Sequence, residues 1–306
     1  MSEPDAFPPH APECGSRLSV ASATSAGAGE CDPAYRAAQA AEIGAAYQQM
    51  FCIANDLKVA LTQRNRARAA VAAAQRRAMR QLVTVSARRE AGGLEHCLRV
   101  GLISALIAQK LGKAAPWCER LFEAAPAHDM GNIAIPDAIL FKAGRLTERE
   151  WAVVRDHPLV GANLLADARN PIQQMAAEIA LNHHEKWDGS GYPAGREGTD
   201  IPLAARIVAV ADFVDSLALE NSTRDKLDDE TIFALLRSAS GAQFDPQVVR
   251  AMHAVRPQLE AVRTLTATHR TRFPGDGARQ TWWHELRLAP PMPVHDRTHG
   301  QAAPPA

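Results

Sequence analysis

Between residues 92 and 263, apolar residues recur at the three- and four-residue spacing of α-helices, and the alternating pattern typical of strands is scarce. Thr147 and Glu150 have the spacing of a capping box and predict a helix that begins at Glu148. A helical region of about 170 residues is long enough to bury a proper core. We therefore predict an all-α fold with one helical domain over residues 91–263.

Histidines and aspartates interrupt the apolar faces of these predicted helices. His96 shares a helical face with Val100 and Ile103, and Asp212 lies within the apolar run "IVAVADFV". One such residue is usually a satisfied core residue, but a buried carboxylate is costly unless it is paired or binds a cation. Seven of them suit two divalent transition metals, because imidazole and carboxylate bind Fe, Mn, Co or Zn. The candidate ligands are His96, His128, Asp129, His157, His183, His184 and Asp212.

Residues 34–90 are rich in Ala, Gln and Arg and contain no proline, which predicts a helical linker. Ile43, Met50 and Leu57 fall at heptad spacing, so we expect a coiled coil, formed by a long helix or a helical hairpin that dimerises through residues 43–90. From Leu57 to Arg89 there are nine Lys or Arg residues and no acid. Two interpretations stay open for this basic stretch: a solvated helix face, or a surface for an acidic protein partner.

Both ends of the chain have a different composition. Residues 1–33 are rich in Pro, Ala, Ser and Gly and predict a disordered N-terminal tail. Residues 264–306 are punctuated by Pro and Gly and predict a low-complexity C-terminal tail. Trp282 and Trp283 are the exceptions there, and they either dock onto the body or a partner or belong to a weakly ordered tail.

The bulk properties narrow the classes of partner and compartment. The formal net charge is +0, so we expect no nucleic-acid polymer as a partner. No apolar run reaches the length of a membrane span, and the N-terminus lacks the layout of a signal peptide, so we expect a cytoplasmic protein. The five cysteines are scattered without C-x-x-C spacing, which indicates reduced thiols.

Several motifs together resemble the HD-GYP phosphodiesterases, a branch of the HD metal-dependent phosphohydrolases that opens cyclic di-GMP. They are "HD" at 128, "DHPLVG" at 156, "HHEKWDGSGYP" at 183, "IPLAARIVAVADFVDSL" at 201 and "FDPQVV" at 244. The resemblance implies an HD-type helical bundle and hydrolysis of cyclic di-GMP or a related cyclic dinucleotide by a hydroxide that bridges two metals, Fe or Mn. It also implies that Asp129 bridges the metals, with one completed by His96, His128 and Asp212 and the other by His157, His183 and His184.

The resemblance also implies where substrate binds. Gly191, Tyr192 and Pro193 form the loop that names the family, and we expect it to contact substrate. Asn132 stands where the family carries a lysine in "HD-x-G-K", so we expect a catalytic and substrate contact there that lacks the charge. The family's Arg-Pro-Tyr-Lys segment is replaced by "ALENSTRDKLDDE", in which Arg224 and Lys226 are the candidate substitutes.

A third difference from the family, after Asn132 and the replaced Arg-Pro-Tyr-Lys segment, concerns the number of metals. Relatives that bind a third metal carry an acid four residues before the first histidine, and this position is Gly92 here. Glu90 and Glu95 are out of register with it, so the resemblance implies a site for two metals.

Two functions from different classes follow from this pattern. The complete set of seven ligands favours a metal-dependent phosphodiesterase. The absence of the family's lysine at position 132 and of its Arg-Pro-Tyr-Lys segment favours a weak or inactive HD-GYP domain that serves as a ligand-sensing or protein-interaction module in bacterial signalling.

Overall fold

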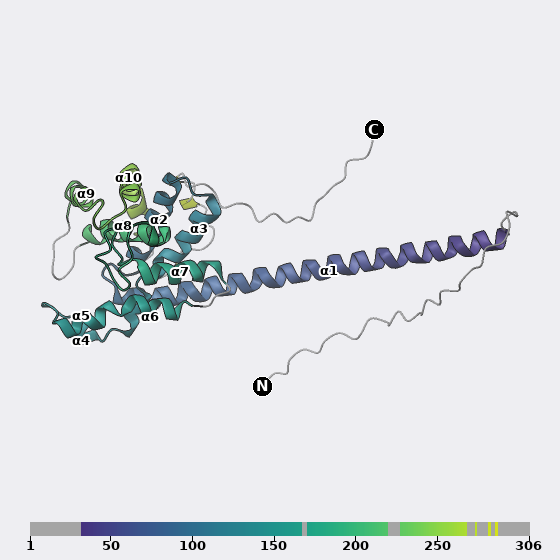
Figure 1. Cartoon of the computed structure of the whole chain (residues 1–306), viewed down its shortest axis with the longest axis horizontal. Helices are drawn as coiled ribbons and strands as arrows, with labels where there is room; N and C mark the ends of the chain where they lie inside the picture. Colours follow the sequence, from purple (N-terminus) through teal and green to yellow (C-terminus); the bar gives the residue numbers. More distant parts are fainter. Residues whose placement is uncertain are drawn as a thin grey trace. The chain divides into compact units, whose positions relative to one another are not determined.

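The computed structural model describes residues 32–166, 170–219, 227–267, 273, 281–282 and 285–286. The chain divides into two units, Met1–Arg66 and Ala67–Ala306. Every regular element in the described residues is a helix, beside two isolated β-bridges, so the predicted all-α fold is confirmed (Figure 1). The α-helices are α1 Pro33–Ser86, α2 Gly93–Lys110, α3 Ala115–Ala124, α4 Asp137–Leu140, α5 Glu148–Arg155, α6 His157–Leu164, α7 Pro171–Asn182, α8 Leu203–Leu217, α9 Asp229–Ser238, α10 Pro246–Val255 and α11 Leu259–Thr266. The 3₁₀ turns are η1 Ala87–Arg89, η2 Ala125–Ala127, η3 Met130–Ala134, η4 Gly198–Asp200 and η5 Arg256–Gln258.

Helix α1 is one continuous helix of 54 residues. Its start is fixed by Asp32, whose carboxylate accepts a hydrogen bond from the backbone N–H of Ala34 at 3.0 Å, and by Pro33 in the first helical position. The predicted long helix is therefore confirmed, and the alternative of a helical hairpin is wrong.

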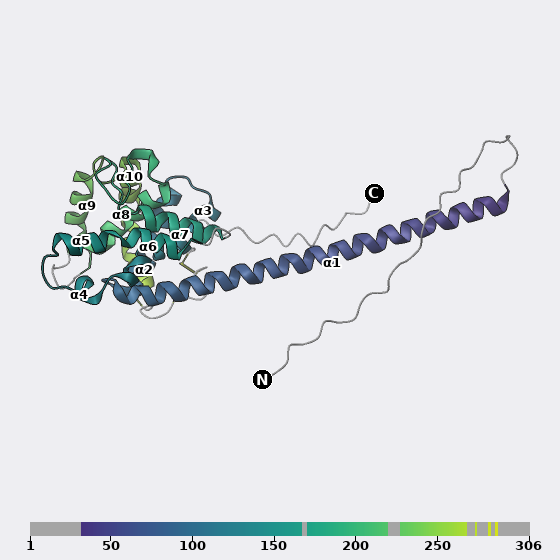
Figure 2. The same cartoon turned by 60° about the horizontal axis from the view of Figure 1, so that its bottom comes forward.

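Helix α2 packs against α3, α8, α10 and α11. Figure 2 shows it within the group of short helices that forms the second unit. Its sequence is apolar almost all the way round, which is why most of its residues are buried. Gly112, with a φ of 74°, ends the helix, and the N–H of Lys113 donates to the carbonyl of Ala108 at 3.0 Å.

The core of the second unit extends beyond the predicted domain of residues 91–263. Met79 and Val83, from the last turns of α1, are buried in it. Trp282 and Leu286 are also buried in this core, so part of the expected C-terminal tail packs against the helices. Trp283 lies outside the described residues, as does the expected N-terminal tail up to residue 31.

The basic stretch has partners within the second unit. Arg80 forms an ion pair with Glu123 at 2.6 Å, and Arg89 forms one with Asp137 at 2.8 Å. These arginines are therefore engaged inside the chain, which leaves fewer of the nine basic residues for an acidic partner.

No single described helix has the length and apolarity to cross a membrane. The bent pair Pro33–Arg89 and Gly93–Lys110 passes that test together, by length and composition only.

Candidate metal centre

The seven predicted ligands come from five segments of the second unit and converge on one place. His96 lies in the first turn of α2, and Asp212 lies on α8. Helix α3 ends at Ala124, and the 3₁₀ turn containing Pro126 leads directly into His128 and Asp129. The remaining ligands are placed by the start of α6 and the end of α7, and they are His157, His183 and His184.

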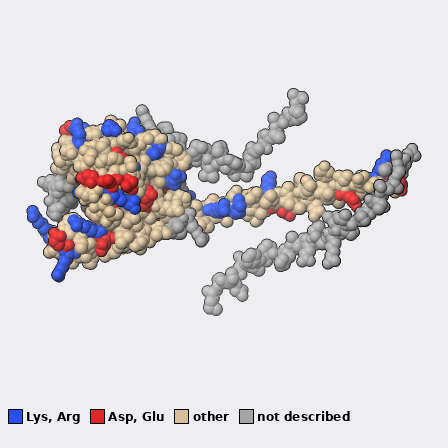
Figure 3. Space-filling model, in the orientation of Figure 1, with Lys and Arg blue, Asp and Glu red and all other residues tan. Residues whose placement is uncertain are grey.

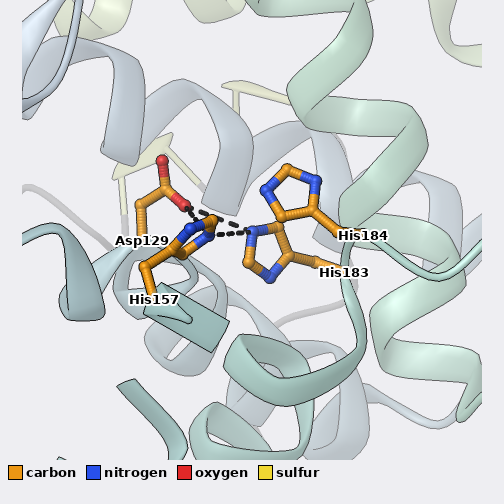
Figure 4. Close-up of side chains that lie close together, drawn as sticks. All are labelled: Asp129, His157, His183 and His184. Atoms are coloured by element: carbon orange, nitrogen blue, oxygen red, sulfur yellow. Dashed lines mark hydrogen bonds and ion pairs between the residues drawn. The ribbon is translucent and has the colours of Figure 1, made fainter. Parts of the chain in front are cut away.

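Four of these side chains form a first group, shown in Figure 4: Asp129, His157, His183 and His184. Their ligand atoms all lie within 4.8 Å of one another. Asp129 Oδ1 lies 3.3 Å from His157 Nε2 and 3.2 Å from His183 Nε2, and the two imidazole nitrogens are 3.5 Å apart. This is the clustering that a small cation requires from its ligands.

Backbone carbonyls fix the orientation of three imidazole rings. The Nδ1 of His157 is 2.6 Å from the carbonyl of Val154, and that of His183 is 3.0 Å from the carbonyl of Ala180. The Nδ1 of His128 is likewise 3.1 Å from a carbonyl one turn earlier. Once a cation displaces the Nε2 proton, Nδ1 can keep its bond to the carbonyl while the lone pair of Nε2 binds the metal.

The pKa shifts of Asp129 and His184 suit metal binding. Burial opposes protonation of His157, but its hydrogen bond to Asp129 raises the pKa of His157 while no metal is bound. Burial opposes ionisation of Asp129, but the charge of His128 and hydrogen bonds from His157 and His183 hold the pKa of Asp129 well below its usual range. Burial and the neighbouring charge of His183 hold the pKa of His184 well below its usual value. An ionised carboxylate beside a neutral imidazole is the protonation state that a metal ion requires.

The carboxylate of Asp215 orients His96, a candidate ligand outside the first group. The Nε2 of His96 lies 3.3 Å from Asp212 Oδ1, while its Nδ1 lies 2.7 Å from Asp215 Oδ2. Asp215 is buried and also accepts a hydrogen bond from Arg99 Nε at 2.7 Å. Such a carboxylate behind a histidine ligand fixes its tautomer and raises its basicity. Asp215 was not predicted from the sequence, although it follows Asp212 by one helical turn.

We expect the Asp215→Asn variant to bind Mn(II) about 10-fold to 100-fold more weakly, because the amide is a poorer partner for His96 and for Arg99. Competition with a chelator of known affinity measures this change. Wild-type affinity in a variant that unfolds like wild type would contradict the role of Asp215.

Glu90 joins His96 and His128 in a second group that could hold a metal ion. The sequence spacing predicted no acid here, since Glu90 lies six residues before His96 rather than four. The structure accommodates the two extra residues with consecutive left-handed glycines, Gly92 at a φ of 84° and Gly93 at 57°. The Gly-Gly pair was therefore the signal in the sequence that could have identified Glu90.

Two buried polar atoms support a cation at this second group. Within the described residues, Glu90 Oε1 and His128 Nε2 are buried without a hydrogen-bond partner. Burial raises the pKa of Glu90, and the charge of His128 opposes that shift. Buried polar atoms are rarely left without a partner, so this donor set of carboxylate and imidazole fits a divalent cation.

The GYP loop is held against the first group. The ring of Tyr192 stacks on His184 with centroids 4.8 Å apart at 22°, and the guanidinium of Arg155 lies 5.8 Å from the centre of the Tyr192 ring. The buried carboxylate of Glu185 accepts hydrogen bonds from the N–H groups of Ala194 and Arg196 at 2.7 and 3.0 Å. These contacts fix the loop as one wall of the site.

Gly191 is required by the close packing of this loop. A Cβ atom there would lie 2.3 Å from the backbone nitrogen of Lys186 and 2.6 Å from the carbonyl oxygen of His184. Backbone atoms cannot move aside as a flexible side chain does, so only glycine fits next to the paired histidines.

A pocket of about 350 Å³ opens beside the centre. Three candidate ligands line it, together with Tyr192, Lys186 and an apolar wall that includes Phe213, Leu217 and Phe244. The ligands in its lining are His183, His184 and Asp212.

Of the residues expected to contact substrate, some line the pocket and others do not. Tyr192 lines the pocket, whereas Gly191 and Pro193 are not among its lining residues. The buried Asn132 is not among them either, and its Nδ2 donates to Asp129 Oδ2 at 2.9 Å. The structure places the side chain of Asn132 against the candidate ligand Asp129, and its expected contact with substrate stays a prediction. Arg224 and Lys226 lie outside the described residues.

Comparison with known proteins gives one family and several relatives. A family model described as HD domain matches residues 50–248. The cyclic di-GMP phosphodiesterase response regulator RpfG of Xanthomonas campestris pv. campestris is 42% identical over 174 residues, which are 57% of this chain and 46% of that protein. A 3'3'-cGAMP-specific phosphodiesterase 2 of Vibrio cholerae is 41% identical over 175 residues, 57% of this chain and 33% of that protein. A cyclic di-GMP phosphodiesterase of Thermotoga maritima is 40% identical over 167 residues, 55% of this chain and 45% of that protein.

These matches span less than half the length of each of the three relatives. The HD domain model, in contrast, covers well over half of the 306 residues of this chain. The chain therefore belongs to the HD domain family.

Proposed function

We propose that the protein is a metal-dependent phosphodiesterase that hydrolyses a cyclic dinucleotide. The observation that carries this proposal is the position of the candidate ligands: His183, His184 and Asp212 line the pocket in which a substrate would bind. The names of the relatives support the substrate class, since they are phosphodiesterases for cyclic di-GMP and 3'3'-cGAMP.

Asp129 and the histidines around it would hold two divalent cations, Fe(II) or Mn(II), which supply an activated water molecule and offset the negative charge of a phosphoryl group. The protein's own contribution is to keep these ligands ionised or neutral as required and oriented before substrate arrives. Carbonyls orient the rings, and Asn132 anchors the second oxygen of Asp129 at 2.9 Å. Catalysis then depends on positioning and electrostatics, as is usual in phosphoryl transfer.

The pocket offers a surface for a nucleobase and a basic side chain for a phosphate of a cyclic dinucleotide. Its volume of about 350 Å³ lies in the range of about 300–1,000 Å³ that is typical of small-molecule sites. Phe213 and Phe244 lie with ring centroids 4.9 Å apart and offer an apolar surface on which a nucleobase can pack. Among the described residues that line this pocket, Lys186 is the single Lys or Arg. We therefore assign it to a substrate phosphate.

We expect the Lys186→Ala variant to raise KM for cyclic di-GMP by about 10-fold with a small change in kcat, because the lysine acts on bound phosphate in both ground and transition states. Steady-state kinetics measure the two constants. The matched control is Lys113→Ala, which removes an exposed lysine that does not line the pocket. Equal KM values in the two variants would contradict the assignment of Lys186.

One observation favours a second candidate function, a domain that binds a cyclic dinucleotide without turnover. The family's lysine position holds Asn132 here, and its side chain contacts Asp129 and not the pocket. The site would then retain its metals and ligand but lack part of the positive charge that stabilises a transition state.

Turnover separates the two functions. The full chain, purified anaerobically and loaded with Fe(II) or Mn(II), is incubated with cyclic di-GMP or 3'3'-cGAMP and the products are followed by chromatography. Loss of substrate that stops on chelation and returns with metal supports the phosphodiesterase. Tight binding of metal and cyclic dinucleotide with no product supports the binding domain.

A further inference from the structure

Nine apolar residues form a continuous stripe along the part of α1 that belongs to the first unit. Starting from Ile43 at position a, they occupy the a, d and e positions of a heptad repeat. The large side chains of the stripe are 39–67% exposed. This apolar stripe consists of Ile43, Ala46, Tyr47, Met50, Ile53, Ala54, Leu57, Ala60 and Leu61.

The other faces of the same helix segment carry all of its polar and charged side chains, Gln48, Gln49, Asn55, Asp56 and Lys58, together with the exposed apolar residues Phe51 and Val59 and the small residues Gly44, Ala45 and Cys52. The stripe itself contains no charged residue, and it ends where Arg64 occupies the next a position. Most of the visible surface of α1 is accordingly neither acidic nor basic in Figure 3. A continuous apolar stripe without charge along a helix is typical of a helix that packs against another helix.

A second copy of the chain matches this stripe in shape and in charge. Two identical helices present the same heptad repeat, so the large and small side chains of one fit between those of the other. Residues 33–61 contain two bases, Arg36 and Lys58, and two acids, Glu42 and Asp56, so their net charge is zero (2 − 2) and two copies do not repel. An acidic partner would gain nothing from a stripe without basic residues.

The segments of this chain outside the described residues offer no such match. Residues 1–31 have four prolines within the first twelve positions and only two large apolar residues after them, Leu18 and Val20, and residues 287–306 contain five prolines, so neither sequence carries a matching heptad repeat. They therefore do not provide the partner helix that the stripe requires.

The area is also adequate for a stable dimer. From the exposed fractions of its side chains, the stripe would bury on the order of 700 Å² per copy, against about 800 Å² per partner in a specific interface of standard size.

We propose that the protein is a homodimer joined by a coiled coil of α1 through the apolar stripe, residues 43–61. This narrows the dimer segment expected from the sequence, residues 43–90. Met79 and Val83 are buried in the core of the second unit and are not available to a second copy.

Sedimentation equilibrium of the full chain tests the proposal with two matched double variants. Met50→Glu with Leu57→Glu places charge at two a positions of the stripe, whereas Phe51→Glu with Val59→Glu places the same charges on exposed apolar residues off the stripe. Glutamate is a good helix former, so helix content by circular dichroism stays unchanged in both. We expect wild type and the off-stripe variant at twice the 33.0 kDa of one chain, and the stripe variant with a dimer Kd at least about 100-fold higher.

A third variant gives an effect that misfolding cannot imitate. Arg64→Leu extends the apolar a positions by one heptad and should lower the dimer Kd by about 10-fold. A monomeric wild type, a dimer that survives Met50→Glu with Leu57→Glu, or an unchanged Kd in Arg64→Leu would overturn the proposal.

Discussion

The Asp129→Ala variant is expected to lose hydrolysis of cyclic di-GMP by a factor of about 10³ or more. Asp129 Oδ1 lies within 3.3 Å of two histidine nitrogens of the first group, and Asn132 holds its other oxygen. Removing this carboxylate takes away the anion on which the surrounding imidazoles converge, so metal affinity and turnover are lost together. Turnover by chromatography and metal content by mass spectrometry measure both losses.

Asp137→Ala is the matched control for that variant. Asp137 lies eight residues later in an exposed ion pair with Arg89, and exposed pairs contribute little to stability. We expect this control to keep its metal and its rate. Wild-type turnover in Asp129→Ala would show that the hydrolysis does not use this centre.

The Gly131→Ala variant is expected to lower the free energy of unfolding by about 3 kcal/mol and to displace His157 from the centre. A Cβ atom at this position would lie 1.9 Å from the carbonyl oxygen of His157 and 2.8 Å from the backbone nitrogen of Gly161. These are backbone atoms of α6, so the helix itself would have to shift. Urea unfolding monitored by circular dichroism measures the loss of stability, and chelator competition measures the loss of metal affinity.

Gly144→Ala is the control for this substitution. Nothing lies within 4 Å of a Cβ atom at Gly144, and its backbone is not left-handed. We expect the control to unfold within about 0.5 kcal/mol of wild type. If Gly131→Ala behaved the same way, η3 and α6 would not be packed as the structure shows.

The sequence alone identified the candidate ligands that lie in local motifs, and the structure brings them together. The histidine pair at 183 and 184 and the His128–Asp129 pair interrupt apolar helical patterns, and apolar surroundings make such residues conspicuous. The capping box at Thr147 was also predicted, and the structure confirms it. Features encoded within a few neighbouring residues were therefore predictable.

Features that depend on loop geometry or on distant packing were not predictable in this way. Glu90 reaches His96 only because two successive glycines adopt left-handed conformations, which a fixed spacing rule does not consider. The burial of Trp282 depends on helices far away in the sequence. The contact of Asn132 with Asp129 was also not predicted, because a motif position does not show which neighbour a side chain reaches.

The most direct test of the central claim is hydrolysis of cyclic di-GMP in ¹⁸O-labelled water by the full chain loaded with Fe(II) or Mn(II), with the product analysed by mass spectrometry. A hydrolytic phosphodiesterase places one ¹⁸O atom in the terminal phosphate of the linear product, and chelation of the metal abolishes that product. Unchanged cyclic di-GMP in the presence of fully bound metal would contradict the account and leave a domain that binds its ligand without opening it.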